Sequence, residues 1–232
     1  MTFRDWLDSI INLFYPRVCA ACGEPLLKGE ETVCLKCRYA LSKTGYELHP
    51  DNPVALMFAG RIKLHAATAC FFFAKSGKVQ HLIHELKYKN NKEAGIFLGR
   101  EMGQTLKEAP LFQGIDYLIP VPLHPKREQQ RGYNQSLMIA QGINEVTGIP
   151  IGDKFLVRVK YTETQTHKTA EERHQNVKDI FELHHADELQ GKHLLLIDDV
   201  LTTGATLEAC ARQLEHISGI TISVATAACA GN

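Results

Sequence analysis

The chain has 232 residues, of which 44% are hydrophobic, and its 26 lysine and arginine residues balance 26 aspartate and glutamate residues. This length accommodates one sizeable domain and a small additional module. A net charge of zero argues against a globally basic nucleic-acid-binding protein. No apolar stretch approaches the ~20 residues of a membrane span, so we expect no membrane insertion.

The first segment, residues 1–17, predicts a short amphipathic helix. Asp5 and Asp8 are charged, Asn12 interrupts the apolar run, and Pro16 would end the helix. These features make a poor secretion signal, so we expect a cytoplasmic protein.

Two Cys-x-x-Cys pairs follow, with eleven residues between them. Four thiolates at this spacing can surround one Zn²⁺ tetrahedrally and leave no open coordination position, so the zinc would be structural. Two disulfides or a redox pair are the alternatives, and disulfides would need an oxidising compartment. We predict a zinc-ribbon-like module over residues 18–45, with four metal ligands: Cys19, Cys22, Cys34 and Cys37.

From residue 66 onward the pattern predicts alternating strands and helices, which is typical of a mostly parallel sheet. The expected strands are 69–73, 117–121, 194–200 and 221–227, and residues 155–160 are expected to be extended. The expected helices are 79–89, 93–106, a helix ending near 146, and 206–217; residues 123–132 are expected to form a loop. Five lysines against one acid between Lys75 and Lys92 indicate either a solvated helix face or a rim that attracts phosphate.

Residues 194–207 read LLLIDDVLTTGATL and carry the strongest functional signal. Residues 194–197 are typical of a strand buried on both faces of a parallel sheet. Asp198 and Asp199 fall at its carboxyl end, where open α/β sheets bind ligands. The loop that follows opens a helix whose N-terminus favours an anion. It consists of Thr202, Thr203, Gly204, Ala205 and Thr206. Carboxylates can accept hydrogen bonds from sugar hydroxyls, and the N–H groups of the loop can bind a phosphate. Together these groups fit a ribose 5-phosphate.

Two other interpretations fit parts of this run. A Walker B strand also ends in acids, but its G-x-x-x-x-G-K-[ST] partner does not occur in the sequence. A buried strand followed by a capped helix would explain the aliphatic residues, Asp199 and one threonine. It would not explain the second acid or the Thr-Thr-Gly loop.

The run closely resembles the phosphoribosyl-pyrophosphate (PRPP) motif of type I phosphoribosyltransferases. Further motifs resemble the ComF-type competence family: Leu86-Lys87-Tyr88, Ile119-Pro120-Val121-Pro122-Leu123-His124, Arg131-Gly132-Tyr133-Asn134-Gln135, and the spaced set Arg158, Gln165, Arg173, Asn176, Val177 and Phe181. Their order covers nearly the whole chain. The resemblance implies an α/β type I phosphoribosyltransferase fold over residues 46–232. Its mostly parallel sheet would be flanked by helices and carry a hood, which we expect to be built from the zinc module and residues 66–73.

The resemblance also implies a site for PRPP with Mg²⁺. Asp198 and Asp199 would be the catalytic acids, orienting the ribose and balancing an oxocarbenium-like transition state, and residues 202–206 would anchor the 5-phosphate. The loop after the Pro-Val-Pro strand would hold pyrophosphate, and guanidinium groups match phosphate geometry. The candidates there are Arg127, Arg131 and Gly132, with Lys87 as a weaker one. Residues 161–175 resemble a mobile loop that closes over the reacting centre. For each candidate, a surface loop or a charged helix face is the alternative.

Three functions remain open. The first is a PRPP-binding phosphoribosyltransferase-like protein of the ComF type, with transfer of phosphoribosyl to an unidentified acceptor and release of pyrophosphate. The second is a non-catalytic factor that handles single-stranded DNA in natural transformation and works with the DNA-uptake machinery, such as a competence helicase. Tyr88, Tyr133 and Tyr161 lie near basic residues and could stack on bases. The third is a regulator that senses PRPP without turnover.

Overall fold

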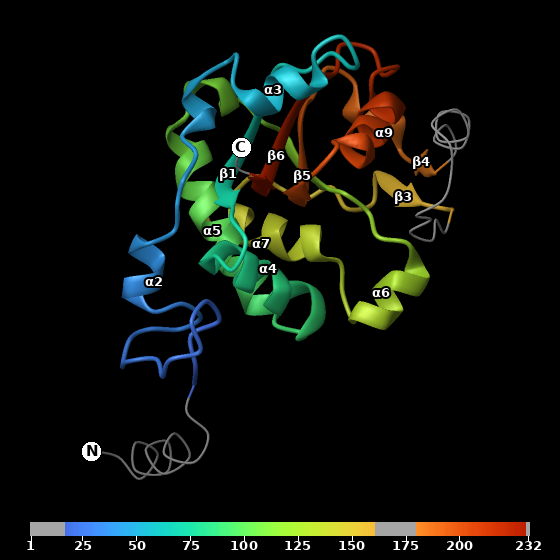
Figure 1. Ribbon diagram of the computed structural model, residues 1–232. Helices are drawn as coiled ribbons and strands as arrows, with labels where there is room; N and C mark the ends of the chain where they lie inside the picture. Colours follow the sequence, from blue (N-terminus) through green and yellow to red (C-terminus); the bar gives the residue numbers. More distant parts are fainter. Residues whose placement is uncertain (1–16, 161–179, 231–232) are drawn as a thin grey trace.

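The computed structural model describes residues 17–160 and 180–230 (Figure 1). The predicted N-terminal helix lies almost entirely outside these residues, and the predicted mobile loop lies wholly outside them. Among the described helices, none is long and apolar enough to cross a bilayer.

A four-stranded sheet forms the centre of the fold, in the order β1-β6-β5-β2. Its strands are β1 (Ala66–Phe73), β2 (Tyr117–Pro120), β5 (His193–Leu201) and β6 (Thr221–Ala230). All three neighbouring pairs are parallel, so the carboxyl ends of the strands meet at one edge. The predicted parallel sheet is therefore confirmed. The expectation that residues 66–73 belong to a hood is wrong, because this buried apolar run pairs with β6 as an edge strand of the sheet.

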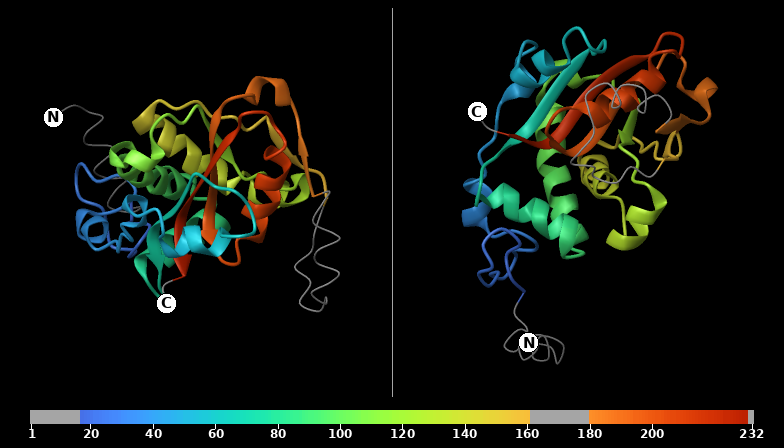
Figure 2. Two further views of the ribbon diagram at one scale, coloured as in Figure 1. Left: turned by 90° about the horizontal axis from the view of Figure 1, so that it is seen from above. Right: turned by 45° about the vertical axis from the view of Figure 1, so that its right-hand side comes forward.

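Each face of the sheet carries its own hydrophobic core. Leu195 and Ile197 of β5 point into one core, and Leu194 and Leu196 point into the other, as the alternation along a strand requires. The first core is covered by α4 (Lys78–Tyr88), α5 (Lys92–Glu108) and α7 (Gln135–Thr147). The second is covered by α3 (Pro53–Phe58), α9 (Ala205–Leu214), β3 (Leu156–Arg158) and β4 (Phe181–Leu183). Figure 2 shows the sheet between these two layers.

Helices α5 and α7 touch backbone to backbone. A Cβ atom added at Gly99 would lie 2.0 Å from the carbonyl oxygen of Ile139, and one added at Gly142 would lie 2.1 Å from that of Ile96. Only glycine permits this approach at either position. The contact fixes how far α7 lies from the rest of its layer.

The structure also contains elements that the sequence pattern did not predict. Residues 123–132, expected as a loop, include the helix α6 (Pro125–Arg131). The His124 ring caps it by accepting from the Lys126 N–H, and Gly132 ends it with a φ of 81°. Short polar helices of this kind have no apolar period from which to be recognised. The remaining short elements are α2 (Leu35–Tyr39), η1 (Tyr46–Leu48), η2 (Pro110–Phe112) and η3 (Ala186–Leu189).

The segment with the two Cys-x-x-Cys pairs packs against the outer side of α4 and α5 (Figure 1). The Arg38 guanidinium lies 2.7 Å from the nearly buried Glu101 carboxylate of α5, and the Lys43 ammonium lies 3.4 Å from it. Lys43 also forms an antiparallel bridge with Phe71, beside the free edge of β1. The cysteine segment is thus attached both to the helices and to the sheet.

Candidate functional site

The two carboxylates at the end of β5 have different partners. The Asp198 Oδ1 atom accepts hydrogen bonds from the Ser136 hydroxyl at 3.0 Å and from the Asp199 N–H at 2.9 Å. The Asp199 Oδ1 atom lies 2.8 Å from the Lys87 Nζ atom. Asp198 is half-buried and Asp199 is buried. Strand β5 thus places two acids side by side, one held by a neutral donor and the other by a cation.

Burial and the neighbouring Asp199 carboxylate raise the pKa of Asp198 to about 7, against the lowering effect of the Ser136 hydrogen bond and of Lys87. Near neutral pH the Asp198 carboxyl therefore exchanges between its protonated and ionised forms. A ligand that brings positive charge or hydroxyl donors would favour the ionised form. Such a group is suited to holding the hydroxyls of a sugar.

The loop after β5 turns sharply into α9. Gly204 is buried and has a φ of 74°, a conformation that side-chain-bearing residues rarely adopt. The Thr203 hydroxyl accepts a hydrogen bond from the Ala205 N–H at 3.4 Å. Thr202, Thr203, Ala205 and Thr206 are all exposed. Their backbone and hydroxyl groups at the N-terminus of a ten-residue helix form an arrangement that can accept an anion.

A cavity of about 830 Å³ brings most of the predicted site residues together. Its walls include seven of them: Lys87, Arg127, Arg131, Asp198, Asp199, Thr202 and Thr206. Gly132 lines a neighbouring groove of about 630 Å³, which shares Lys87, Arg127 and Arg131 with the cavity. Thr203, Gly204 and Ala205 complete the loop but do not line the cavity.

The start of α7 contributes residues that the sequence did not single out for roles. The Asn134 side chain caps the helix by accepting from the Ser136 N–H, and it donates to the Val121 carbonyl just after β2. These bonds place the Ser136 hydroxyl against Asp198. The expectation that Tyr133, just before α7, stacks on a base is wrong, because Tyr133 is buried and its hydroxyl donates to the Leu86 carbonyl at 2.6 Å. This bond ties the start of α7 to α4. The predicted motif at residues 131–135 stops one residue short of Ser136, so extending it would have included that residue.

Arg158 of β3 is another cavity residue without a predicted role. Its guanidinium carbon lies 5.6 Å from the centre of the Phe181 ring, on β4. Burial and the nearby Arg127 lower the pKa of Arg158. The cavity therefore has a third arginine besides Arg127 and Arg131. An anion would relieve the repulsion among these charges.

The basic groove extends from the cavity over α4 and α6. It is lined by Lys87, Tyr88, Asn90, Arg127, Gln129, Gln130, Arg131 and Gly132. Tyr88 is 67% exposed, so the groove carries an aromatic residue that is open to solvent. The Arg131 guanidinium donates to the Gln135 side chain at 2.9 Å, which fixes its direction.

The four predicted zinc ligands form a compact cluster. Their sulfur atoms all lie within 4.8 Å of one another, and those of Cys22 and Cys34 are 3.9 Å apart. Tetrahedral Zn–S bonds of ~2.3 Å would place sulfur atoms about 3.8 Å apart. The N–H groups of Ala21 and Cys34 donate to the Cys19 sulfur at 3.4 and 3.3 Å. Against the effect of burial, these bonds lower the pKa of Cys19 to about 7. The cluster therefore fits a structural zinc ion.

Residues 135–231 match the family model of the phosphoribosyl transferase domain. That range contains the second half of the sheet and both acids. Together with the parallel sheet and the loop-to-helix turn after β5, the match defines a type I phosphoribosyltransferase fold with a four-cysteine cluster in front of it.

Three relatives identify the family within this fold class. The chain is 36% identical over 201 residues to "Competence protein ComFC" of Bacillus subtilis. This alignment covers 82% of this chain and 80% of that protein. It is 33% identical over 146 residues to "DNA utilization protein YhgH" of Salmonella typhi, and 32% identical over 140 residues to "Competence protein F" of Haemophilus influenzae. These two matches span 63% and 61% of the relatives' own lengths. The chain belongs to the ComF-type competence family.

A solved structure of glutamine phosphoribosylpyrophosphate amidotransferase from B. subtilis, complexed with ADP and GMP, is also similar. It shares 18% sequence identity, with a TM-score of 0.42, over 62% of this chain and 30% of that one.

Proposed function

We propose that the 830 Å³ cavity binds PRPP together with Mg²⁺. In this assignment Asp198 and Asp199 hold the ribose hydroxyls, and residues 202–206 hold the 5-phosphate. Lys87, Arg127, Arg131 and Gly132 hold the pyrophosphate. Bound Mg²⁺ would supply positive charge to the pyrophosphate as it leaves. The single observation that supports this most is that two acids, a threonine loop and a basic wall meet at one end of β5.

The strand order suggests where an acceptor would enter. The basic groove follows β2, on one side of β5, whereas Phe73 and Ala230 line the cavity at the ends of β1 and β6, on the other side. A displacement that inverts the sugar carbon needs the nucleophile and the leaving group on opposite faces of the ribose. We therefore assign the acceptor to the side of β6 and β1, at the cavity wall formed by Phe73 and Ala230.

The test is calorimetric titration of PRPP with Mg²⁺ into the zinc-loaded full chain. We expect binding that is lost in the Asp198→Asn/Asp199→Asn double variant, because amides accept sugar hydroxyls less strongly and carry no charge. Asp153→Asn changes an exposed acid just before β3 and is the matched control. Absence of binding in the unmodified protein would contradict the proposal. Binding that persists in the double variant would move the site away from the acids.

A second function, the handling of single-stranded DNA, is favoured by the basic groove. Single-stranded DNA binds grooves that combine positive charge with an exposed aromatic ring. Lys87, Arg127 and Arg131 supply the charge here, and Tyr88 supplies the ring. Of the three relatives described above, two carry names that refer to competence and one carries a name that refers to DNA utilization.

Fluorescence anisotropy with a labelled oligonucleotide tests this second function. Tyr88→Ala should weaken binding by about tenfold, since one base stack contributes ~1–3 kcal/mol. Tyr39→Ala removes an exposed tyrosine on α2, away from the groove, and is the control. Equal affinities of the two variants would contradict a role for the groove. Competition by PRPP with Mg²⁺ would show that DNA and PRPP use overlapping surfaces.

A further inference from the structure

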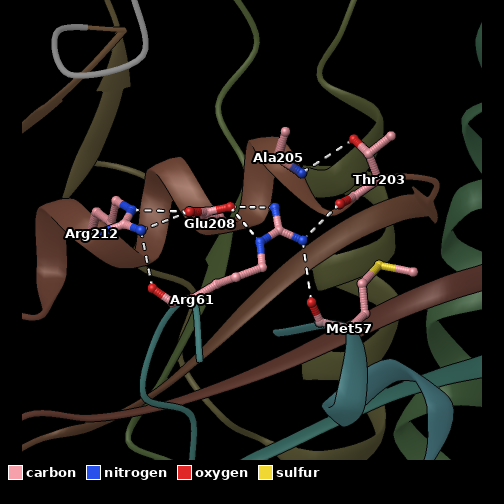
Figure 3. A network of polar contacts seen from close by, with 6 residues as sticks. All are labelled: Met57, Arg61, Thr203, Ala205, Glu208 and Arg212. Carbon is pink, nitrogen blue, oxygen red and sulfur yellow. Dashed lines mark hydrogen bonds and ion pairs between the residues drawn. The ribbon is translucent and has the colours of Figure 1, made fainter. Parts of the chain in front are cut away.

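Arg61, just after α3, bonds the backbone of the loop at residues 202–206 (Figure 3). Its Nη1 atom donates to the carbonyl oxygens of Thr203 at 3.1 Å and of Met57 at 3.2 Å. Its Nε atom donates to the Glu208 carboxylate at 2.9 Å, and its Nη2 atom bonds the same oxygen. One guanidinium group therefore joins α3, the loop and α9.

The surrounding contacts make this arrangement rigid. Arg212 donates to the Arg61 carbonyl at 3.0 Å and to the Glu208 carboxylate at 2.8 Å. The Phe58 ring packs against Gly204, where an added Cβ would lie 2.8 Å from the ring. The segment from Phe58 to Arg61 is thus fastened to the turn and to α9 at several points.

The bond to Thr203 fixes the direction of one peptide group. In a trans peptide the C=O and the following N–H point in opposite directions. Because the Thr203 carbonyl points to Arg61, the Gly204 N–H points away from Arg61. Thr202 and Thr206, which line the cavity, flank this turn. The guanidinium therefore fixes the direction of the Gly204 N–H, one of the backbone donors of the loop.

Arg61 also offsets a charge that would oppose an anion. Glu208 lies in the first turns of α9, where a bound phosphate would face a carboxylate as well as the helix N–H groups. Arg61 and Arg212 both bond that carboxylate, and both lower its pKa against the effect of burial. Glu208 therefore remains ionised and paired, so that its charge is largely cancelled.

We propose that Arg61 is a positioning residue for the ribose 5-phosphate. It lies far outside the 194–207 motif, and it acts by turning the Thr203–Gly204 peptide so that the Gly204 N–H is available to the phosphate. The assignment rests on the proposed binding of PRPP. It adds that affinity for the 5-phosphate depends on a residue that does not line the cavity.

The experiment compares two fragments of PRPP on the full chain. Ribose 5-phosphate probes the loop, and pyrophosphate probes the basic side. Arg61→Ala should raise the Kd of ribose 5-phosphate by about tenfold, as expected for the loss of one charged hydrogen bond. The Kd of pyrophosphate should stay within about twofold, because separate sites behave additively. Retained pyrophosphate affinity also shows that the variant is folded.

Arg100→Ala is the matched control, because it removes a partly exposed arginine that pairs with Glu145 and bonds neither Arg61 nor Glu208. We expect less than about a twofold change in the Kd of ribose 5-phosphate, since exposed ion pairs contribute little. If Arg61→Ala does not fold, Arg61→Lys keeps the charge but cannot span Thr203, Met57 and Glu208 together, and it should still weaken ribose 5-phosphate several-fold.

Several outcomes would overturn the assignment. One is an unchanged Kd of ribose 5-phosphate in the folded Arg61 variant. Another is equal weakening in Arg100→Ala, and a third is full rescue of Arg61→Ala by Glu208→Gln, which would leave only charge neutralisation. If the unmodified protein binds PRPP and pyrophosphate but not ribose 5-phosphate, this inference fails while the proposed function stands. If it binds none of the three, both fail.

Discussion

The Lys87 ammonium lies 2.8 Å from the Asp199 carboxylate and links the last turn of α4 to the end of β5. The two residues are 112 positions apart in the chain. Their side chains are only 22% and 12% exposed, so the pair is largely shielded from water. The neighbouring Leu86 carbonyl is held by Tyr133, which keeps the end of α4 in place. Lys87 therefore contacts Asp199 and also lines the basic groove, where it can contact an anion.

We expect Lys87→Met to weaken PRPP binding by about tenfold or more, because it removes a charged ligand contact and leaves Asp199 without its cation. The free energy of unfolding should fall by about 1–2 kcal/mol for the same reason. Calorimetry and urea unfolding measure the two effects. Lys89→Met, two residues further on an exposed surface, should change neither quantity. Equal effects of the two substitutions would contradict a specific role for Lys87.

The raised pKa of Asp198 predicts a pH-dependent stability. The native carboxyl has a pKa of about 7, against an ordinary value of 3.8, so between these values the native state holds a proton that the unfolded state has released. Stability therefore falls as the pH rises through this window. Asp198→Asn removes this pH dependence. The free energy of unfolding of the variant, relative to that of the unmodified protein, should therefore rise by about 2 kcal/mol from pH 5 to pH 8. Thermal unfolding at the two pH values checks this, and a pH-independent difference would contradict it.

The cysteine cluster predicts one bound zinc ion per chain by elemental analysis. Cys22→Ser should lose the metal and lower the free energy of unfolding by at least about 3 kcal/mol, because structural zinc contributes folding energy directly. Prolonged chelation should have the same effect on the unmodified protein. Cys229→Ala, in β6, should keep the metal. Full zinc content in the Cys22 variant would show that the metal is held elsewhere.

The contact between α5 and α7 predicts an unusually costly glycine substitution. Gly142→Ala places a methyl group where the Ile96 carbonyl already lies, so the helices must separate. We expect a loss of about 3 kcal/mol or more in urea unfolding, beyond ordinary overpacking. Gln104→Ala, on the exposed face of α5, should be close to neutral. A small loss at Gly142 would mean that α7 can shift freely.

Much of the sheet could be predicted because its residues are strongly patterned. Residues 194–197 form the buried centre of β5, and the helix expected at 79–89 is α4 (Lys78–Tyr88). The site was harder to predict, because its geometry depends on contacts between distant residues. The bond between Ser136 and Asp198 joins residues 62 positions apart and follows from the cap of α7. Arg61 lies in no motif, and only the folded chain shows its contact with the loop.

The cysteine segment and the helices beside it share one hydrophobic core, and this bears on how separable the two parts are. The buried side chains of the segment lie in the same cluster as those of α4 and α5: Cys19, Ala21, Val33, Cys37 and Leu41. Deleting the segment would expose the outer faces of these helices to water, and α4 also carries Lys87. The cysteine segment is therefore part of the packed domain and not a separable module. A relative without the cysteines would need other residues to cover these helix faces, or the cavity wall at Lys87 would change.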